Sequence, residues 1–119
     1  MRPEGRDPAY LWDMLEAARH IQKYTAGLTL DRYLKDSMVQ AAVERKLEVL
    51  GEAARRVSEP FKQAHPEIPW RQVIAQRNVL AHEYGEIVPT LVWKTVVTYI
   101  PELVTKLEPL IPPLPPEIP

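Results

Sequence analysis

Three side chains able to do chemistry lie within one segment of this chain, Arg77-Asn78-Val79-Leu80-Ala81-His82-Glu83-Tyr84. They are the guanidinium of Arg77, the imidazole of His82 and the phenol of Tyr84. A histidine with a pKa near its usual value of about 6.5 can remove or return a proton, and an arginine can hold a phosphate and the charge that develops on it. This set suits attack of a ribose 2′-hydroxyl on the neighbouring phosphodiester, a reaction that needs no metal ion.

Helical geometry brings only two of these side chains together. At about 100° per residue, Arg77 and Tyr84 point almost the same way, whereas His82 lies about 140° from Arg77. For His82 to join them the helix must loosen at its last turn, and Gly85 followed by Pro89 gives it a reason to end there. A second copy of the chain could also bring its own set alongside. From residue types and spacing alone, a helix cap with a packed ring stays open as the alternative.

The other ionisable candidates have simpler explanations. Glu44, Glu48 and Glu52 repeat every four residues along one predicted helix. Arginine and lysine residues flank them, so an exposed or ion-paired face explains the stripe, although Glu52 is kept as a supporting candidate. His20 and His65 have no partners at the spacing of a metal or nucleophile site, and we expect both to be structural.

Composition narrows the class of protein. The 119 residues carry a net charge of −1 and 45% hydrophobic side chains, which is typical of one small domain. There is no cysteine, and no glutamate is followed by histidine three residues later, so we expect neither a thiolate metal site nor a di-metal carboxylate site, and no cofactor. No stretch approaches the roughly 20 apolar residues that span a bilayer, and we expect a cytoplasmic protein that does not use a membrane.

Apolar residues recur at helical spacing along most of the chain, which predicts an all-α, antiparallel, up-and-down bundle of four long helices. The first is expected to start at an Asp7 N-cap before Pro8 and to end at Gly27. The second starts at a cap on Asp36 or Ser37 and stops before Pro60. Gly51 in its interior indicates a close crossing with another helix.

The second half of the chain is expected to hold two more helices. The third runs from Trp70 to near Gly85, and the fourth has Pro89 in its first turn and a kink at Pro101. A connector that contains Tyr33 and Leu34 joins the first two helices, and the proline-bounded segment from Phe61 to Pro69 holds one short turn. Side chains expected to face the core are Leu11, Met14, Leu15, Ala18, Ile21, Thr25, Val39, Val43, Leu47, Leu50, Ala54, Val57, Val73, Ile74, Leu80, Trp93, Val96, Val97, Ile100, Val104 and Leu107.

The C-terminal end cannot continue a helix. The chain becomes proline-rich from Pro109, and we divide it into a helical domain over residues 1–110 and a proline-rich tail over residues 111–119. The tail should be extended and polyproline-like. It is either a stiff end or a peptide ligand for a partner groove.

The chemical segment resembles a known family signature. Arg77 through Tyr84 is similar to the Arg-x4-His-x-Tyr motif of the HepT-like toxins in the HEPN superfamily, including the polar Asn78 after the arginine. Ala42-Val43-Glu44-Arg45, Leu50-Gly51-Glu52-Ala53-Ala54 and Ile68-Pro69-Trp70 also resemble that family in order and spacing. The likeness covers roughly residues 8 to 110.

The resemblance implies a HEPN-like homodimer whose two motifs face a shared cleft. It also implies a metal-independent endoribonuclease toxin of a type II-like toxin–antitoxin pair. Arg77 would bind the scissile phosphate of RNA, His82 would act as general base or acid, and Asn78 would orient the substrate. The partner would be a minimal nucleotidyltransferase antitoxin, which transfers AMP from ATP to Tyr84. An attached AMP would then repel and exclude RNA phosphate.

Two other functions remain open at this stage. The bundle could be a non-catalytic HEPN binding partner or substrate-binding subunit of a nucleotidyltransferase, which presents Tyr84 and the Arg77 cleft as a platform. It could also be a structural adaptor that uses its proline tail, but this alternative leaves the motif unexplained.

Overall fold

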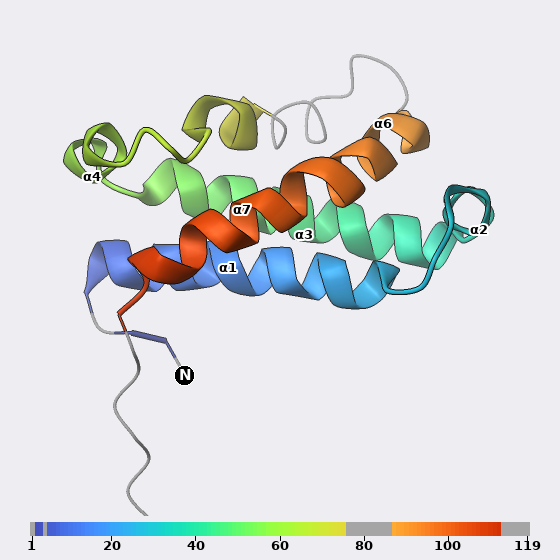
Figure 1. Ribbon diagram of the computed structural model, residues 1–119, viewed down its shortest axis with the longest axis horizontal. Helices are drawn as coiled ribbons and strands as arrows, with labels where there is room; N and C mark the ends of the chain where they lie inside the picture. The colour runs from blue at the N-terminus through green and yellow to red at the C-terminus, as the bar shows by residue number, and fades with distance from the viewer. Residues whose placement is uncertain (1, 4, 76–86, 113–119) are drawn as a thin grey trace, which may run out of the picture.

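Two long antiparallel helices form the base of the fold. The computed structural model describes residues 2–3, 5–75 and 87–112, and within these ranges the elements are helices and none is a strand, which confirms the all-α class. Helices α1 (Arg6–Thr25) and α3 (Ser37–Arg56) lie side by side in opposite directions, as Figure 1 shows. The short helix α2 (Leu30–Leu34) joins them.

A second layer of helices crosses this pair. Helix α4 (Glu59–Ala64) follows α3, and residues 70–75 are helical. An interrupted helix then runs obliquely over α1 and α3 (Figure 1). It consists of α6 (Pro89–Lys94), the π-helical η1 (Thr95–Tyr99), α7 (Ile100–Leu107) and the 3₁₀ turn η2 (Glu108–Leu110).

Helix α1 starts earlier than the sequence predicts. Its N-cap is Gly5, with φ of 96°, so the expected cap at Asp7 is wrong. The Asp7 carboxylate lies in the first turn, where it accepts hydrogen bonds from the backbone N of Ser58 at 2.8 Å and from Ser58 Oγ at 2.6 Å. Asp7 therefore joins the start of α1 to the start of α4, 51 residues away, and its charge also suits the positive end of the helix dipole.

The link between α1 and α3 holds a helix that was expected to be an irregular connector. The Oγ1 atom of Thr29 accepts a hydrogen bond from the backbone N of Arg32 at 3.2 Å, which caps α2. The next cap is the expected one, because Asp36 Oδ1 accepts from the backbone N of Val39 at 3.0 Å and α3 begins there. Helix α2 has five residues, too few to show a helical period.

The fourth helix is disrupted immediately before Pro101. In an α-helix the ring of Pro101 would clash with the carbonyl four residues earlier, and it has no N–H to donate. The chain widens into a π turn instead, and the backbone N of Ile100 donates to Thr95 O, five residues back. This turn also corrects one expected core position, since Val97 is 51% exposed while Val96 and Ile100 face inward.

The core lies between α1, α3 and the interrupted helix. The most completely buried of its large side chains include those expected from the periodicity: Leu11, Met14, Ile21, Val43, Leu47, Leu50 and Leu107. Tyr33 and Ile68 join them from the connectors. No helix in the described part of the chain is long and apolar enough to cross a bilayer.

Candidate functional site

The four motif residues, Arg77, Asn78, His82 and Tyr84, lie outside the described residues, which stop at Ala75 and resume at Ile87. Their assigned roles therefore stay predictions. What the structure describes is the framework on both sides of the motif, the candidate Glu52 on α3, and a cavity next to the point where the motif begins.

Aromatic packing fixes the helix that leads into the motif. The indole Nε1 of Trp70 donates to the backbone O of His65 at 2.9 Å, and the Trp70 ring meets Phe61 edge to face with centroids 6.3 Å apart. Val73 donates its backbone N–H to Pro69 O at 3.0 Å. These contacts hold the start of the 70–75 helix against α4 and the turn that follows it. The helix that precedes the motif in the sequence is therefore packed on the rest of the fold.

After the motif the chain continues into helix α6, which begins with a proline. Val88 has an extended backbone, and its carbonyl accepts from the backbone N of Leu91 and of Val92, so Pro89 stands at the first position of α6 as the sequence predicts. The 70–75 helix and α6, which flank the motif in the sequence, lie on the same side of α3 in Figure 1.

Glu52 lies on α3 as an ion-paired, partly buried carboxylate. Its Oε1 accepts from Arg55 Nη2 at 2.8 Å and from Arg56 Nε at 2.9 Å. These bonds raise the pKa values of both guanidinium groups, because they favour the charged forms. Glu48 is paired too, with Arg45 Nη1 at 3.2 Å. The ion-paired face expected for this stripe is therefore present at Glu48 and Glu52.

Glu44 differs from its two neighbours along the stripe. Partial burial raises its pKa, and the negative charge of Glu48 raises it further. Within the described ranges no group of three histidine, aspartate or glutamate side chains could hold a metal ion.

His20 and His65 both have structural contacts. The His20 ring stacks on Tyr24 with centroids 6.0 Å apart. The His65 ring packs on Phe61 with centroids 4.4 Å apart, and its Nδ1 lies 3.1 Å from Oε2 of Glu67. The pKa of Glu67 is lowered, mainly by a hydrogen bond from the backbone and to a smaller extent by this contact with His65. These contacts are those expected of structural histidines, and the interpretation of both stays a prediction.

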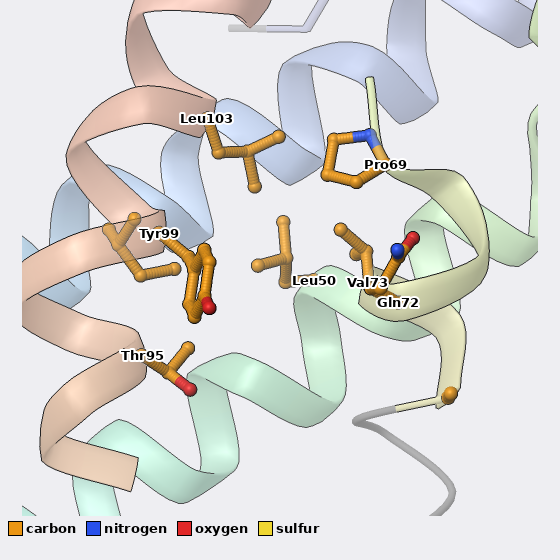
Figure 2. Close-up of a pocket in the computed structure, with 9 residues that line it drawn as sticks. Leu50, Pro69, Gln72, Val73, Thr95, Tyr99 and Leu103 are labelled. Atoms are coloured by element: carbon orange, nitrogen blue, oxygen red, sulfur yellow. The ribbon is translucent and has the colours of Figure 1, made fainter. Parts of the chain in front are cut away.

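A cavity of about 450 Å³ opens beside the helix that enters the motif. Figure 2 shows Tyr99 on one side of it, Gln72 and Val73 on the other, and Leu50 and Leu103 between them. The described residues that line it are Leu50, Pro69, Gln72, Val73, Ala75, Thr95, Tyr99, Ile100 and Leu103. Gln72 and Tyr99 were not selected from the sequence, because one comes from the 70–75 helix and the other from the π turn η1, and no local pattern shows that these two segments line one cavity.

Comparison with known proteins gives the family. The family model described as ribonuclease HepT-like matches residues 14–110. "Probable ribonuclease HepT" of Thermococcus cleftensis is 41% identical over 101 residues, which cover 85% of this chain and 92% of that protein. "Putative RNase MJ1380" of Methanocaldococcus jannaschii is 33% identical over 100 residues, covering 84% and 92%. No solved structure matches the chain significantly.

The family match includes the whole segment from Arg77 to Tyr84, the helix that enters it and the helix that leaves it. It agrees with the resemblance seen in the motif and with the all-α fold. The chain belongs to the HepT-like ribonuclease family of the HEPN superfamily.

Proposed function

We propose that this protein is a metal-independent endoribonuclease, the toxin of a toxin–antitoxin pair, and that AMP transfer to Tyr84 neutralises it. The observation that carries the proposal is the family match over residues 14–110, within which Arg77 and His82 stand at the spacing of the motif. The described framework supports it, because a packed helix precedes the motif segment and helix α6, with Pro89 at its first position, follows it.

The proposed reaction uses the side chains of Arg77 and His82. An imidazole removes the proton of a ribose 2′-hydroxyl, and the 2′-oxygen attacks the adjacent phosphorus. The bond to the 5′-oxygen breaks, this oxygen takes up a proton, and a 2′,3′-cyclic phosphate remains on the upstream product. The Arg77 guanidinium binds the phosphate oxygens as their charge builds, and Asn78 orients the substrate.

We propose a two-fold homodimer with the motif segments of both chains near the axis. Val88 and Leu91 lie one helical turn apart directly after the motif, and they are 48% and 63% exposed. Two exposed apolar side chains this close together can form part of a larger apolar contact surface, which is the kind that marks an interaction site. In such a dimer, the second copy of the motif can supply the proton donor or acceptor that one helix cannot place beside its own Arg77.

Control by AMP transfer follows from the chemistry of the tyrosine. The Tyr84 oxygen attacks the α-phosphorus of ATP, pyrophosphate leaves, and the phenol proton passes to a base of the nucleotidyltransferase. The product carries a phosphodiester and a nucleoside two residues from His82. A negative phosphate there opposes the binding of an RNA phosphate, so modification and loss of cleavage should occur together.

RNA cleavage by the purified protein tests the proposal. Arg77→Ala and His82→Ala should each lower the cleavage rate by about 10²-fold or more, since general acid–base and electrostatic contributions are of this order. His20→Ala is the matched control, because it removes an imidazole that the structure places against Tyr24. Equal cleavage by all three variants would sink the proposal. A protein that binds a nucleotidyltransferase but never cleaves RNA would favour the non-catalytic alternative.

A further inference from the structure

The cavity beside the motif has walls that suit a neutral planar ring. None of its nine described lining residues carries a charge, and most are aliphatic. Its volume of about 450 Å³ lies within the range of roughly 300 to 1,000 Å³ found for small-molecule sites. An uncharged, mainly apolar lining favours a neutral ligand over a phosphate.

Tyr99 offers a ring for stacking. It is 54% exposed although it lines the cavity, and its ring has no aromatic partner among the described side chains. Figure 2 shows the ring across the cavity from Val73. Bases bind to proteins by stacking on such rings, because every base has a flat face.

Gln72 offers a hydrogen-bonding edge on the opposite wall. Its side-chain amide forms no hydrogen bond within the described ranges, and the residue is exposed. An amide supplies both a donor and an acceptor, and glutamine pairs well with the adjacent N6 and N7 positions of adenine. Recognition of a nucleobase combines a ring that stacks on its face with a polar group that reaches its edge.

The cavity is also close to the motif along the chain. Ala75, which lines it, is two residues before Arg77, the residue expected to hold the phosphate. We propose that this cavity is a nucleobase-binding subsite, with Tyr99 stacking on the base and Gln72 reading its edge. The base could belong to an RNA strand or to a free nucleotide. For an RNA strand, the inference rests on the proposed function.

Methyl NMR of the full-length protein tests the site without using activity. Adenosine 5′-monophosphate is titrated into the unmodified protein, and a short adenine-containing RNA into the His82→Ala variant. The ring current of a bound base should shift the methyl resonances of Leu50, Val73 and Leu103, which surround the cavity. Shifts with either probe support the subsite. The probe that causes them, the free nucleotide, the RNA or both, identifies the source of the base. No methyl shift with either probe would overturn it.

Paired variants test the two assigned roles. Tyr99→Ala should weaken nucleotide binding about tenfold, since stacking on one ring contributes on that scale, while Tyr99→Phe should keep most of the affinity. Gln72→Leu should weaken binding of adenine and reduce the preference for it over uracil. Gln63→Leu, at an exposed glutamine of α4 outside the cavity, is the control and should change neither.

Two further results would overturn the assignment. Equal methyl shifts with phenol and with adenosine would mean a cavity that accepts any apolar ring. Shifts that follow protein concentration without any ligand would mean that a second copy covers this face. If the nucleotide shifts the methyl resonances but wild-type protein never cleaves RNA, the subsite stands and the ribonuclease proposal fails. If RNA is cleaved but neither probe shifts the methyl resonances, the ribonuclease proposal stands and the subsite fails.

Discussion

Tyr33 provides a quantitative test of the packing between α2 and α6. The side chain is fully buried, and its ring packs on Trp93 with centroids 5.1 Å apart. Its hydroxyl is buried without a hydrogen-bond partner among the described atoms. Burial raises the pKa of Tyr33 to about 12, with a smaller contribution from the charge of Glu44. The folded protein therefore favours the neutral phenol more strongly than the unfolded chain does.

The sign and size of the pH effect follow from this difference. Below about pH 10 the phenol is neutral in both states, and its ionisation does not affect the free energy of unfolding. Between about pH 10 and 12 the phenol ionises in the unfolded chain but stays neutral in the folded protein, so stability falls as pH rises. At about pH 11.5 the loss attributable to Tyr33 is about 2 kcal/mol, since one pKa unit corresponds to about 1.4 kcal/mol.

Tyr33→Phe should remove this loss and also relieve the unpaired hydroxyl. At neutral pH the variant should equal or exceed the wild type in free energy of unfolding by up to about 1 kcal/mol, because a buried hydroxyl without a partner costs energy on that scale. Urea denaturation at about pH 8 and about pH 11.5 measures both effects. Destabilisation by Tyr33→Phe of more than about 1 kcal/mol at pH 8 would contradict the unpaired hydroxyl, and a parallel loss of stability in the two proteins at alkaline pH would contradict the raised pKa of Tyr33.

Three other predictions concern a helix cap, the metal requirement and control. Asp36→Ala should lower the free energy of unfolding by about 1 kcal/mol, because the backbone N–H of Val39 loses its acceptor, whereas Ser37→Ala should change urea stability little. Excess EDTA should leave the RNA cleavage rate unchanged; loss in EDTA that a divalent ion restores would contradict the proposed mechanism. With its antitoxin, the protein should gain mass in units of AMP at Tyr84, and Tyr84→Phe should keep cleavage yet escape neutralisation; full neutralisation of Tyr84→Phe would show inhibition by binding alone.

Much of the helical framework could be predicted from the spacing of apolar residues. The core positions on α1 and α3 follow this period, and the cap at Asp36 and Pro89 at the start of α6 follow from side-chain chemistry. The Asp7 cap was wrong because its carboxylate bonds to Ser58, a partner 51 residues away that no local pattern reveals. Val97 was misplaced because the π turn changes the helical period before Pro101.

The candidate site divides in a similar way. A local motif is visible in a sequence, so Arg77, Asn78, His82 and Tyr84 could be selected together, and the family match includes all of them. Gln72 and Tyr99 could not be selected, since they come from two separate segments, the 70–75 helix and the π turn η1, and only the folded chain places both on one cavity. The ion pairs of Glu52 with Arg55 and Arg56 could be anticipated, because residues three and four apart are neighbours on a helix.

The chemical ends of the cleaved RNA test the central claim most directly. A defined oligonucleotide is incubated in EDTA with wild-type protein and with His82→Ala, and mass spectrometry identifies both new ends. We expect a 2′,3′-cyclic or 3′ phosphate and a 5′-hydroxyl from the wild type, and intact RNA from His82→Ala. Products with a 5′-phosphate and a free 3′-hydroxyl, or unchanged products from His82→Ala, would contradict attack by the 2′-hydroxyl with His82 as the proton-transferring residue.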